Sequence, residues 1–119
     1  MKKIEGNNTL DKNKRQFVDW KKTSKNLALL RQYNENLRKY VCFQLKGKIE
    51  NCSRRDCENC RFEMDERISQ KELAQVFGVS DSVIVNWESG RTNPDIDDLL
   101  FYCQICKMNI FDILILEER

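Results

Sequence analysis

The sequence contains no histidine, a single proline and only four glycines among 119 residues. Because few residues interrupt helices, and because β-branched residues seldom alternate with polar ones, the sequence favours an all-α protein. The lack of histidine removes the commonest general base, and neither a phosphate-cradling glycine loop nor a nucleophile beside a base can be identified. The pattern indicates no enzyme and no small-molecule substrate.

Long apolar runs are scarce as well. No stretch approaches the roughly 18–20 apolar residues of a membrane-spanning helix, and the N-terminal residues lack the apolar middle of a signal peptide. A composition that is 40% hydrophobic and 34% charged is typical of a globular protein, and 119 residues suit one core. We therefore expect a cytoplasmic protein without membrane contact.

The charge is unevenly divided along the chain. Residues 1–48 contain 13 Lys and Arg against 4 Asp and Glu, whereas residues 49–119 contain 8 against 15. A basic half joined to an acidic half is typical of a protein of which one face meets a polyanion. Ordinary solvation of helices by lysine explains the same distribution, so charge alone does not choose between the two interpretations.

The N-terminal half is expected to hold two helices. Thr9 is positioned to cap a short helix whose apolar positions are Phe17, Val18 and Trp20. Ser24 precedes a longer helix that ends near Gly47, with one apolar face formed by Leu27, Leu30, Tyr33, Leu37, Tyr40 and Val41. Because this helix is longer than a small domain needs, we expect it to pack either on the first helix or on a second copy of the chain.

The C-terminal half carries sharper boundary signals. Ser69 and Glu72 predict a capping box at the start of a helix that ends at Gly78. Ser80 predicts the start of a second helix, which ends at Gly90. Two short helices joined by so tight a turn predict a helix-turn-helix unit.

Two more helices are expected after the only proline. Asp95 is placed to cap the first, whose predicted inward face is Ile96, Leu99, Leu100, Tyr102, Cys103 and Cys106. Asn109 is placed to cap the last, which is expected to bury Ile110, Ile113 and Leu114.

Residues 68–114 carry a distinctive set of motifs. These are "SQ" before "ELA", "GVS" at the turn, "WESG" at the end of the second helix, and an apolar run after Pro94. In this combination the stretch resembles the Cro/phage-repressor family of helix-turn-helix domains, also called XRE. The resemblance implies a five-helix, lambda-repressor-like domain that binds double-stranded DNA.

The resemblance also implies a domain organisation. We expect the helix-turn-helix domain over residues 27–119, preceded by a basic and partly helical extension over residues 1–26. The family's first helix normally lies immediately before the helix-turn-helix, and here residues 37–45 are interpreted as its end. Residues 47–66 are therefore interpreted as a Cys-rich insertion.

The resemblance places the helix over residues 81–89 in the DNA major groove. Among its polar residues, Asn86 suits a bidentate contact with adenine, Asp81 can accept from cytosine N4, and Ser82 can serve either base, while Val83 can meet a thymine methyl group. Gln70, Ser89 and Arg91 are expected to contact the phosphate backbone. The complete set of candidate DNA contacts is Gln70, Ser80, Asp81, Ser82, Val83, Asn86, Ser89 and Arg91.

The expected reading helix contains acids but neither lysine nor arginine, so its own field repels phosphate. Positive charge is expected from the basic N-terminal region, or from Arg54 and Arg55. The resemblance makes Glu88 a structural residue that pairs with an arginine of the first helix. Arg38 is the first choice for this partner and Arg31 the second.

Three cysteines, Cys52, Cys57 and Cys60, lie within the stretch "NCSRRDCENC". A disulfide is disfavoured in a reducing cytosol, whereas the C-x4-C-x2-C spacing suits a tetrahedral zinc site. With no histidine in the chain, Cys42 is the preferred fourth ligand, with Asp56 or Glu58 as substitutes. An iron–sulfur cluster or a thiol switch remains open, as do thiols without a metal.

A second CxxC pair, Cys103 and Cys106, falls on one face of a predicted helix. Because free buried cysteine behaves as a small hydrophobe, we interpret this pair as core residues.

The leading interpretation is a homodimeric, sequence-specific transcriptional regulator, and specifically a repressor. A protein-binding adaptor or antitoxin-like partner that uses the helical extension is the alternative. A metal- or redox-sensing regulator that uses the Cys cluster is a further one.

Overall fold

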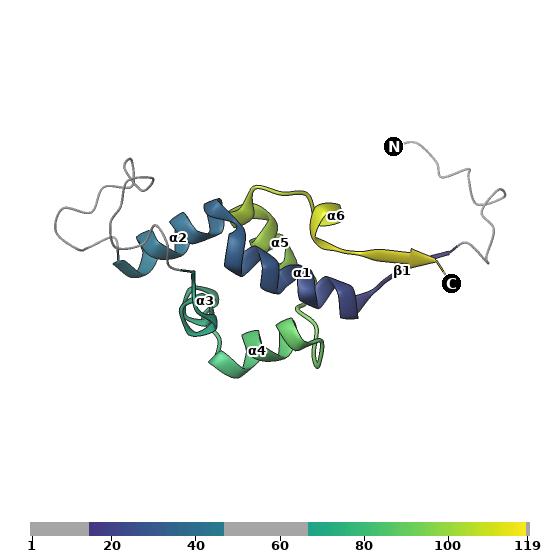
Figure 1. The fold of residues 1–119 in the computed structure, drawn as a ribbon, viewed down its shortest axis with the longest axis horizontal. Helices are drawn as coiled ribbons and strands as arrows, with labels where there is room; N and C mark the ends of the chain where they lie inside the picture. Colours follow the sequence, from purple (N-terminus) through teal and green to yellow (C-terminus); the bar gives the residue numbers. More distant parts are fainter. Residues whose placement is uncertain (1–14, 47–66, 119) are drawn as a thin grey trace.

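Six helices and two short strands make up the part of the chain that the computed structural model describes, residues 15–46 and 67–118 (Figure 1). In chain order they are β1 (Gln16–Val18), α1 (Trp20–Tyr33), α2 (Glu35–Lys46), α3 (Gln70–Phe77), α4 (Asp81–Ser89), α5 (Ile96–Cys106), α6 (Ile110–Ile113) and β2 (Leu116–Glu118). Figure 1 shows α3 and α4 below a layer that contains α1, α2 and α5, with α6 on the side away from α4. The prediction of an all-α, helix-turn-helix architecture is confirmed, and the two-stranded ribbon is an addition to it.

The segment before α1 is a strand, which makes the predicted helix wrong at Phe17 and Val18. Both residues belong to β1, which pairs antiparallel with β2, and Val18 lies opposite Leu116. No local pattern signals this strand, because its partner is at the other end of the sequence. Thr9, the expected cap, lies outside the described residues.

Helix α1 begins at Trp20 because Asp19 caps it. The Asp19 carboxylate accepts a hydrogen bond of 3.0 Å from the backbone N–H of Lys22. The Asp19 N–H donates to the carbonyl of Ile115, and the Ile115 N–H donates to the Thr23 hydroxyl, at 2.7 and 2.9 Å. The start of α1 is thereby tied to the end of the chain. The expected domain boundary between residues 26 and 27 falls inside α1.

The single long helix that we expected from Ser24 onwards is two helices. Asn34 separates them: its N–H donates to the Leu30 carbonyl at the end of α1, and its side chain accepts from the Leu37 N–H at 2.8 Å to start α2. Ser24 does not cap a helix. It lies buried within α1, where its hydroxyl donates to the Trp20 carbonyl at 2.7 Å.

Helices α3 and α4 have the predicted boundaries. The capping box is present, with Ser69 Oγ accepting from the Glu72 N–H and the Glu72 carboxylate accepting from the Ser69 N–H, both at 3.0 Å. Gly78 and Gly90 end the two helices in the left-handed conformation, with φ of 70° and 83°, as predicted. Ser80 precedes α4 with extended backbone, and its side chain makes no capping bond.

Helix α5 is capped by Asp95 as predicted, but its inward face is partly different. Ile96 and Leu100 are 57% and 52% exposed, whereas Ile105, which we did not predict to be inward, is buried. The inward stripe instead consists of Leu99, Tyr102, Ile105 and Cys106, with Cys103 at its edge. Helix α6 buries Ile113, and Ile110 and Leu114 are partly buried around it.

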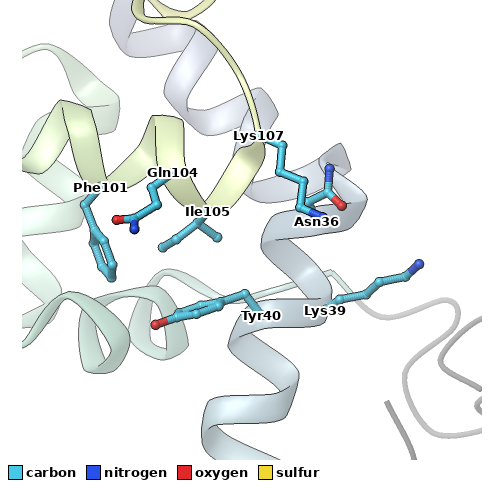
Figure 2. Close-up of a pocket in the computed structure, with 7 residues that line it drawn as sticks. All are labelled: Asn36, Lys39, Tyr40, Phe101, Gln104, Ile105 and Lys107. Carbon is cyan, nitrogen blue, oxygen red and sulfur yellow. The ribbon is translucent and has the colours of Figure 1, made fainter. Parts of the chain in front are cut away.

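One aromatic cluster joins α2, α3, α4 and α5. Phe101 of α5 meets Tyr40 of α2 edge to face, with ring centroids 6.2 Å apart (Figure 2). Phe101 also packs on Phe77 of α3 at 4.8 Å, and Phe77 packs on Trp87 of α4 at 5.6 Å. Each such edge-to-face pair stabilises the fold by about 1 kcal/mol beyond the effect of burying the two rings.

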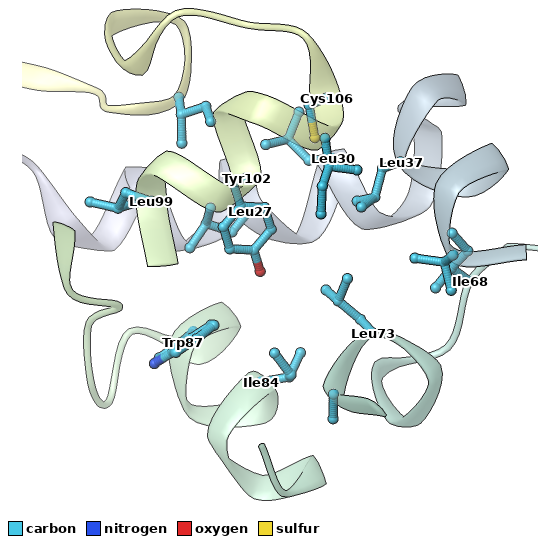
Figure 3. Packing of buried hydrophobic residues seen from close by; sticks show 14 residues of the cluster. Leu27, Leu30, Leu37, Ile68, Leu73, Ile84, Trp87, Leu99, Tyr102 and Cys106 are labelled. Carbon is cyan, nitrogen blue, oxygen red and sulfur yellow. The ribbon is translucent and has the colours of Figure 1, made fainter. Parts of the chain in front are cut away.

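The core lies between the two layers (Figure 3). Tyr102 is at its centre, fully buried, and Leu27, Leu73 and Ile84 reach it from α1, α3 and α4. This packing gives α4 a buried face and leaves its opposite face outside. Within the described residues, no helix is both long and apolar enough to cross a membrane.

Candidate nucleic-acid interface

Helix α4 divides cleanly into a buried and an exposed face. Ile84 and Trp87 are buried, whereas Asp81, Ser82 and Ser89 are exposed. Val83 and Asn86 are partly buried. The polar residues predicted to read bases are therefore mostly at the surface, and Ile84 and Trp87 hold the helix in that orientation.

A buried ion pair ties α4 to α1. The Arg31 Nε lies 2.8 Å from Glu88 Oε2, and Arg31 Nη2 lies 3.0 Å from Oε1, which is a two-pronged contact. Only 14% of the Arg31 side chain and 5% of the Glu88 side chain are exposed. Glu88 has the predicted structural role, and its partner is Arg31, the second choice. The prediction that Arg38 is the partner is wrong, because Arg38 Nη2 lies 3.8 Å from Glu35 Oε1 instead.

The same network extends to the start of α3. Arg31 Nη1 donates to the Ile68 carbonyl at 2.8 Å, and the Gln70 side-chain amide donates to Glu88 Oε1 at 3.0 Å. Gln70, which was expected to reach a phosphate, thus directs its amide to Glu88. Because residues of α1 and α3 both bind the Glu88 carboxylate of α4, the orientation of α4 relative to these two helices depends on Glu88.

The far end of α4 is held by close packing against α1. A Cβ on Gly90 would lie 3.3 Å from Ser24 Oγ, so a side chain at this position would require Ser24 to shift by a few tenths of an ångström. After the turn, the carbonyl of Asn86 accepts from the N–H groups of Arg91 and Thr92, at 3.0 and 3.3 Å. These bonds fix the position of Arg91 relative to the exposed face of α4.

Val85 is a surface residue that the sequence reasoning missed. It is 41% exposed, unlike Val83, and it stands three residues after Ser82 and four before Ser89. Residues at these spacings share one helix face. The signal was available in the sequence, because a helix that buries Ile84 and Trp87 must turn position 85 outward.

At the start of α4, the hydroxyl groups of Ser80 and Ser82 lie 3.0 Å apart. The Ser89 hydroxyl donates to the Asn86 carbonyl at 3.2 Å. Both ends of the exposed face therefore carry hydroxyl groups that are already positioned by local contacts.

Positive charge lies beside α4 rather than on it. Arg91 follows the helix and Lys71 belongs to α3, and both are exposed. Lys21 and Lys25 are exposed on α1, three residues before and one residue after Ser24, which packs against Gly90. Arg54 and Arg55, the other predicted source of positive charge, lie outside the described residues.

The predicted metal ligands are only partly described. Cys42 is half-buried on α2, whereas Cys52, Cys57 and Cys60 lie outside the described residues. Within residues 15–46 and 67–118, no group of three or more His, Cys, Asp or Glu side chains is arranged to hold a metal ion.

The second cysteine pair contributes to packing. Cys106 is 1% exposed, and its burial, with Cys103 nearby, raises the pKa of its thiol to about 12. A thiol with so high a pKa is a poor nucleophile and a poor metal ligand at neutral pH.

Comparison with known proteins agrees with this geometry. The helix-turn-helix family model matches residues 65–113, which span α3 to α6. Residues 65–113 therefore carry a helix-turn-helix domain similar to the Cro/XRE type, which supports a DNA-binding regulator in general. Neither a search of curated proteins nor a search of solved structures found a match.

Proposed function

We propose that the protein is a sequence-specific repressor that inserts α4 into the major groove of its operator. The observation that carries the proposal is the division of α4: Ile84 and Trp87 are buried while Ser82 and Val85 are exposed on the opposite face. A helix held in this way presents side chains to a groove about 12 Å wide without unfolding any part of the core.

The exposed face suits a mixed base sequence. The Asn86 amide can donate to and accept from one adenine, and the Asp81 carboxylate can accept from cytosine N4. Val85 offers an apolar contact for a thymine methyl group, a role that we transfer to it from Val83 because Val85 is the more exposed of the two.

Affinity is proposed to come from cations beside the reading helix. Asp81 brings negative charge to the groove, so phosphate neutralisation must be supplied by neighbouring elements. Lys21, Lys25 and Arg91 are suited to this role, because the contact between Ser24 and Gly90 brings α1 against the end of α4. These residues would bind any sequence alike.

The proposed active form is a homodimer. Two reading helices related by two-fold symmetry would bind half-sites about 34 Å apart, one turn of DNA. Repression would then follow from occupying the operator.

The test is a selection of bound duplexes from a random pool, followed by affinity measurements on the selected site. Asn86→Ala is expected to weaken the selected site by about 1–3 kcal/mol and to relax one base position. Arg91→Ala is expected to weaken selected and random DNA equally and to reduce the dependence of affinity on salt by about one ion.

Lys107→Asn is a matched control, because Lys107 is exposed at the end of α5, in the layer of helices on the other side of the core from α4. It should change neither affinity nor sequence preference. If Asn86→Ala lowers binding to every sequence equally, α4 does not read bases. If the protein is not retained on any duplex at low salt, the proposal fails and a protein-binding adaptor becomes the better account.

A further inference from the structure

An open cavity of about 480 Å³ lies between α2 and α5 (Figure 2), two helices of the layer on the other side of the core from α4 (Figure 1). Small-molecule sites in proteins commonly have volumes of about 300–1,000 Å³, so this cavity is large enough for a compact organic ligand. Seven residues line it: Asn36, Lys39, Tyr40, Phe101, Gln104, Ile105 and Lys107.

The inner wall of the cavity is apolar. The rings of Tyr40 and Phe101 stand at 88° to each other, and Ile105, which is 5% exposed, lies beside them. Two aromatic rings and a branched aliphatic chain favour a flat apolar body. The Gln104 amide extends over the same space and can donate to or accept from a polar substituent.

The rim of the cavity is cationic. Two lysines, Lys39 and Lys107, belong to the described lining: Figure 2 shows the Lys39 ammonium directed away from the aromatic wall, whereas the Lys107 side chain lies at the mouth of the cavity. Lys107 has a left-handed backbone with φ of 58°, an uncommon conformation for a residue with a side chain. This conformation ends α5 through the bond from the Lys107 N–H to the Cys103 carbonyl, and it places the Lys107 side chain beside Asn36 at the mouth of the cavity.

The two walls are joined directly. The Asn36 amide donates to the Cys106 carbonyl at 3.4 Å, so α2 and the end of α5 are held at a defined separation. The cavity is therefore bounded by rigid helices on both sides, which lowers the entropic cost of binding.

We propose that this cavity binds a small organic anion with a planar aromatic body, the body lying against Tyr40, Phe101 and Ile105 and the anionic group at Lys107. Both halves of this ligand class follow from the lining: the apolar wall accepts the body, and the cationic rim selects a carboxylate or sulfonate over a neutral analogue.

An occupant of the cavity would touch the ring of Phe101. Phe101 packs on Phe77, which packs on Trp87 inside α4, with centroid separations of 4.8 and 5.6 Å. A ligand that displaces Phe101 therefore acts through two ring contacts on the helix proposed to read DNA. This regulatory consequence rests on the proposed function, whereas the binding itself does not.

The test uses 1-anilinonaphthalene-8-sulfonate as the anionic probe and N-phenyl-1-naphthylamine as its neutral analogue, titrated into the full chain without DNA. We expect saturable binding of the anionic probe. The variant Lys107→Asn should weaken it about threefold and leave the neutral probe unchanged, because only the charge contact is lost. Asparagine is chosen at position 107 because it tolerates a left-handed backbone.

A filling variant, Gln104→Trp, provides an independent readout, since position 104 is exposed and its side chain extends over the cavity. It should reduce binding of both probes, whereas Lys22→Gln should affect neither. Helix content and urea midpoints of all variants establish that they are folded. Equal binding of the anionic probe by Lys107→Asn and by Lys22→Gln, or unchanged binding by Gln104→Trp, would overturn the site.

The regulatory consequence is measured separately, as the affinity for the selected operator with and without saturating anionic probe. A change of about threefold or more that disappears in Gln104→Trp is the expected result. Probe binding without any change in DNA affinity would refute the coupling and leave the binding site standing. Failure to bind DNA at all would refute the proposed function and leave the probe result untouched.

Discussion

The guanidinium of Arg31 on α1 holds the carboxylate of Glu88 on α4 through two parallel contacts, the shorter of them 2.8 Å. Gln70 donates to the same carboxylate from the start of α3. One buried acid thus joins α1, α3 and α4 and sets the orientation of α4 relative to the other two helices.

We expect Arg31→Met to lower the free energy of unfolding by about 3 kcal/mol, because it leaves Glu88 buried without its partner. Arg31→Lys should recover only part of the loss, since an ammonium group cannot make the two-pronged contact. Urea denaturation followed by circular dichroism measures both. Arg91→Met, on an exposed loop, is the matched control and should stay within about 0.5 kcal/mol of wild type.

The two helix-ending glycines allow a paired test. Both have a left-handed backbone, but a Cβ on Gly90 would lie 3.3 Å from Ser24 Oγ, whereas one on Gly78 would meet nothing within 4 Å. Gly78→Ala should therefore cost only the backbone penalty, about 1–2 kcal/mol. Gly90→Ala should lower the free energy of unfolding by more than Gly78→Ala does, as measured by thermal or urea unfolding. The difference between the two losses of stability should become smaller when Ser24 is also replaced by alanine. An unchanged difference would show that the contact with Ser24 is not its cause.

The buried hydroxyl of Tyr102 leads us to expect that the folded protein loses stability at alkaline pH. This hydroxyl is buried without a hydrogen-bond partner among the described residues, and burial, followed by the nearby charge of Glu88, raises its pKa above the ordinary value of 10.0. The folded protein keeps this proton, whereas the unfolded chain releases it near pH 10. The unfolded state then binds fewer protons, so stability falls as pH rises above about 10, by about 1.4 kcal/mol per pH unit.

Tyr102→Phe removes both the unpaired hydroxyl and its titration. At neutral pH it should be neutral or stabilising by up to about 1 kcal/mol. The difference in unfolding free energy between wild type and Tyr102→Phe should therefore widen in favour of the variant between roughly pH 9 and 11. A difference that stays constant across this range would show that the phenol ionises equally in both states.

The zinc site stays a prediction from sequence, and metal content tests it. Protein purified without oxygen should contain about one zinc ion per chain if Cys42, Cys52, Cys57 and Cys60 are ligands. Cys57→Ser should lower the zinc content, whereas Cys103→Ser, on α5, should not. Visible absorption from iron would favour the cluster alternative, and equal zinc in both variants would exclude Cys57 as a ligand.

Where the sequence predicted structure correctly, the determinants are local. The bounds of α3 and α4 follow from the Ser69 and Glu72 capping box, from Gly78 and from Gly90, each of which acts on backbone within one helical turn. The burial of Ile84 and Trp87 follows from helical spacing alone.

Where the sequence misled, the deciding contact is distant. Asn34 splits the expected long helix, and its role as a cap was masked by an apolar spacing that continues on both sides of it. Ser24 has the chemistry of a cap but is buried against Gly90, and Ile96 and Leu100 have the chemistry of core residues but face outward.

The sequence by itself thus determined the helical class, the helix-turn-helix and the polar character of the exposed face of α4, because caps, turns and periodicity act over a few residues. Only the tertiary structure decided which arginine pairs with Glu88, that Phe17 and Val18 form a strand with the C-terminal residues, and that α2 and α5 enclose a cavity. Each of these depends on residues far apart in the chain, whose separation in space no local pattern encodes.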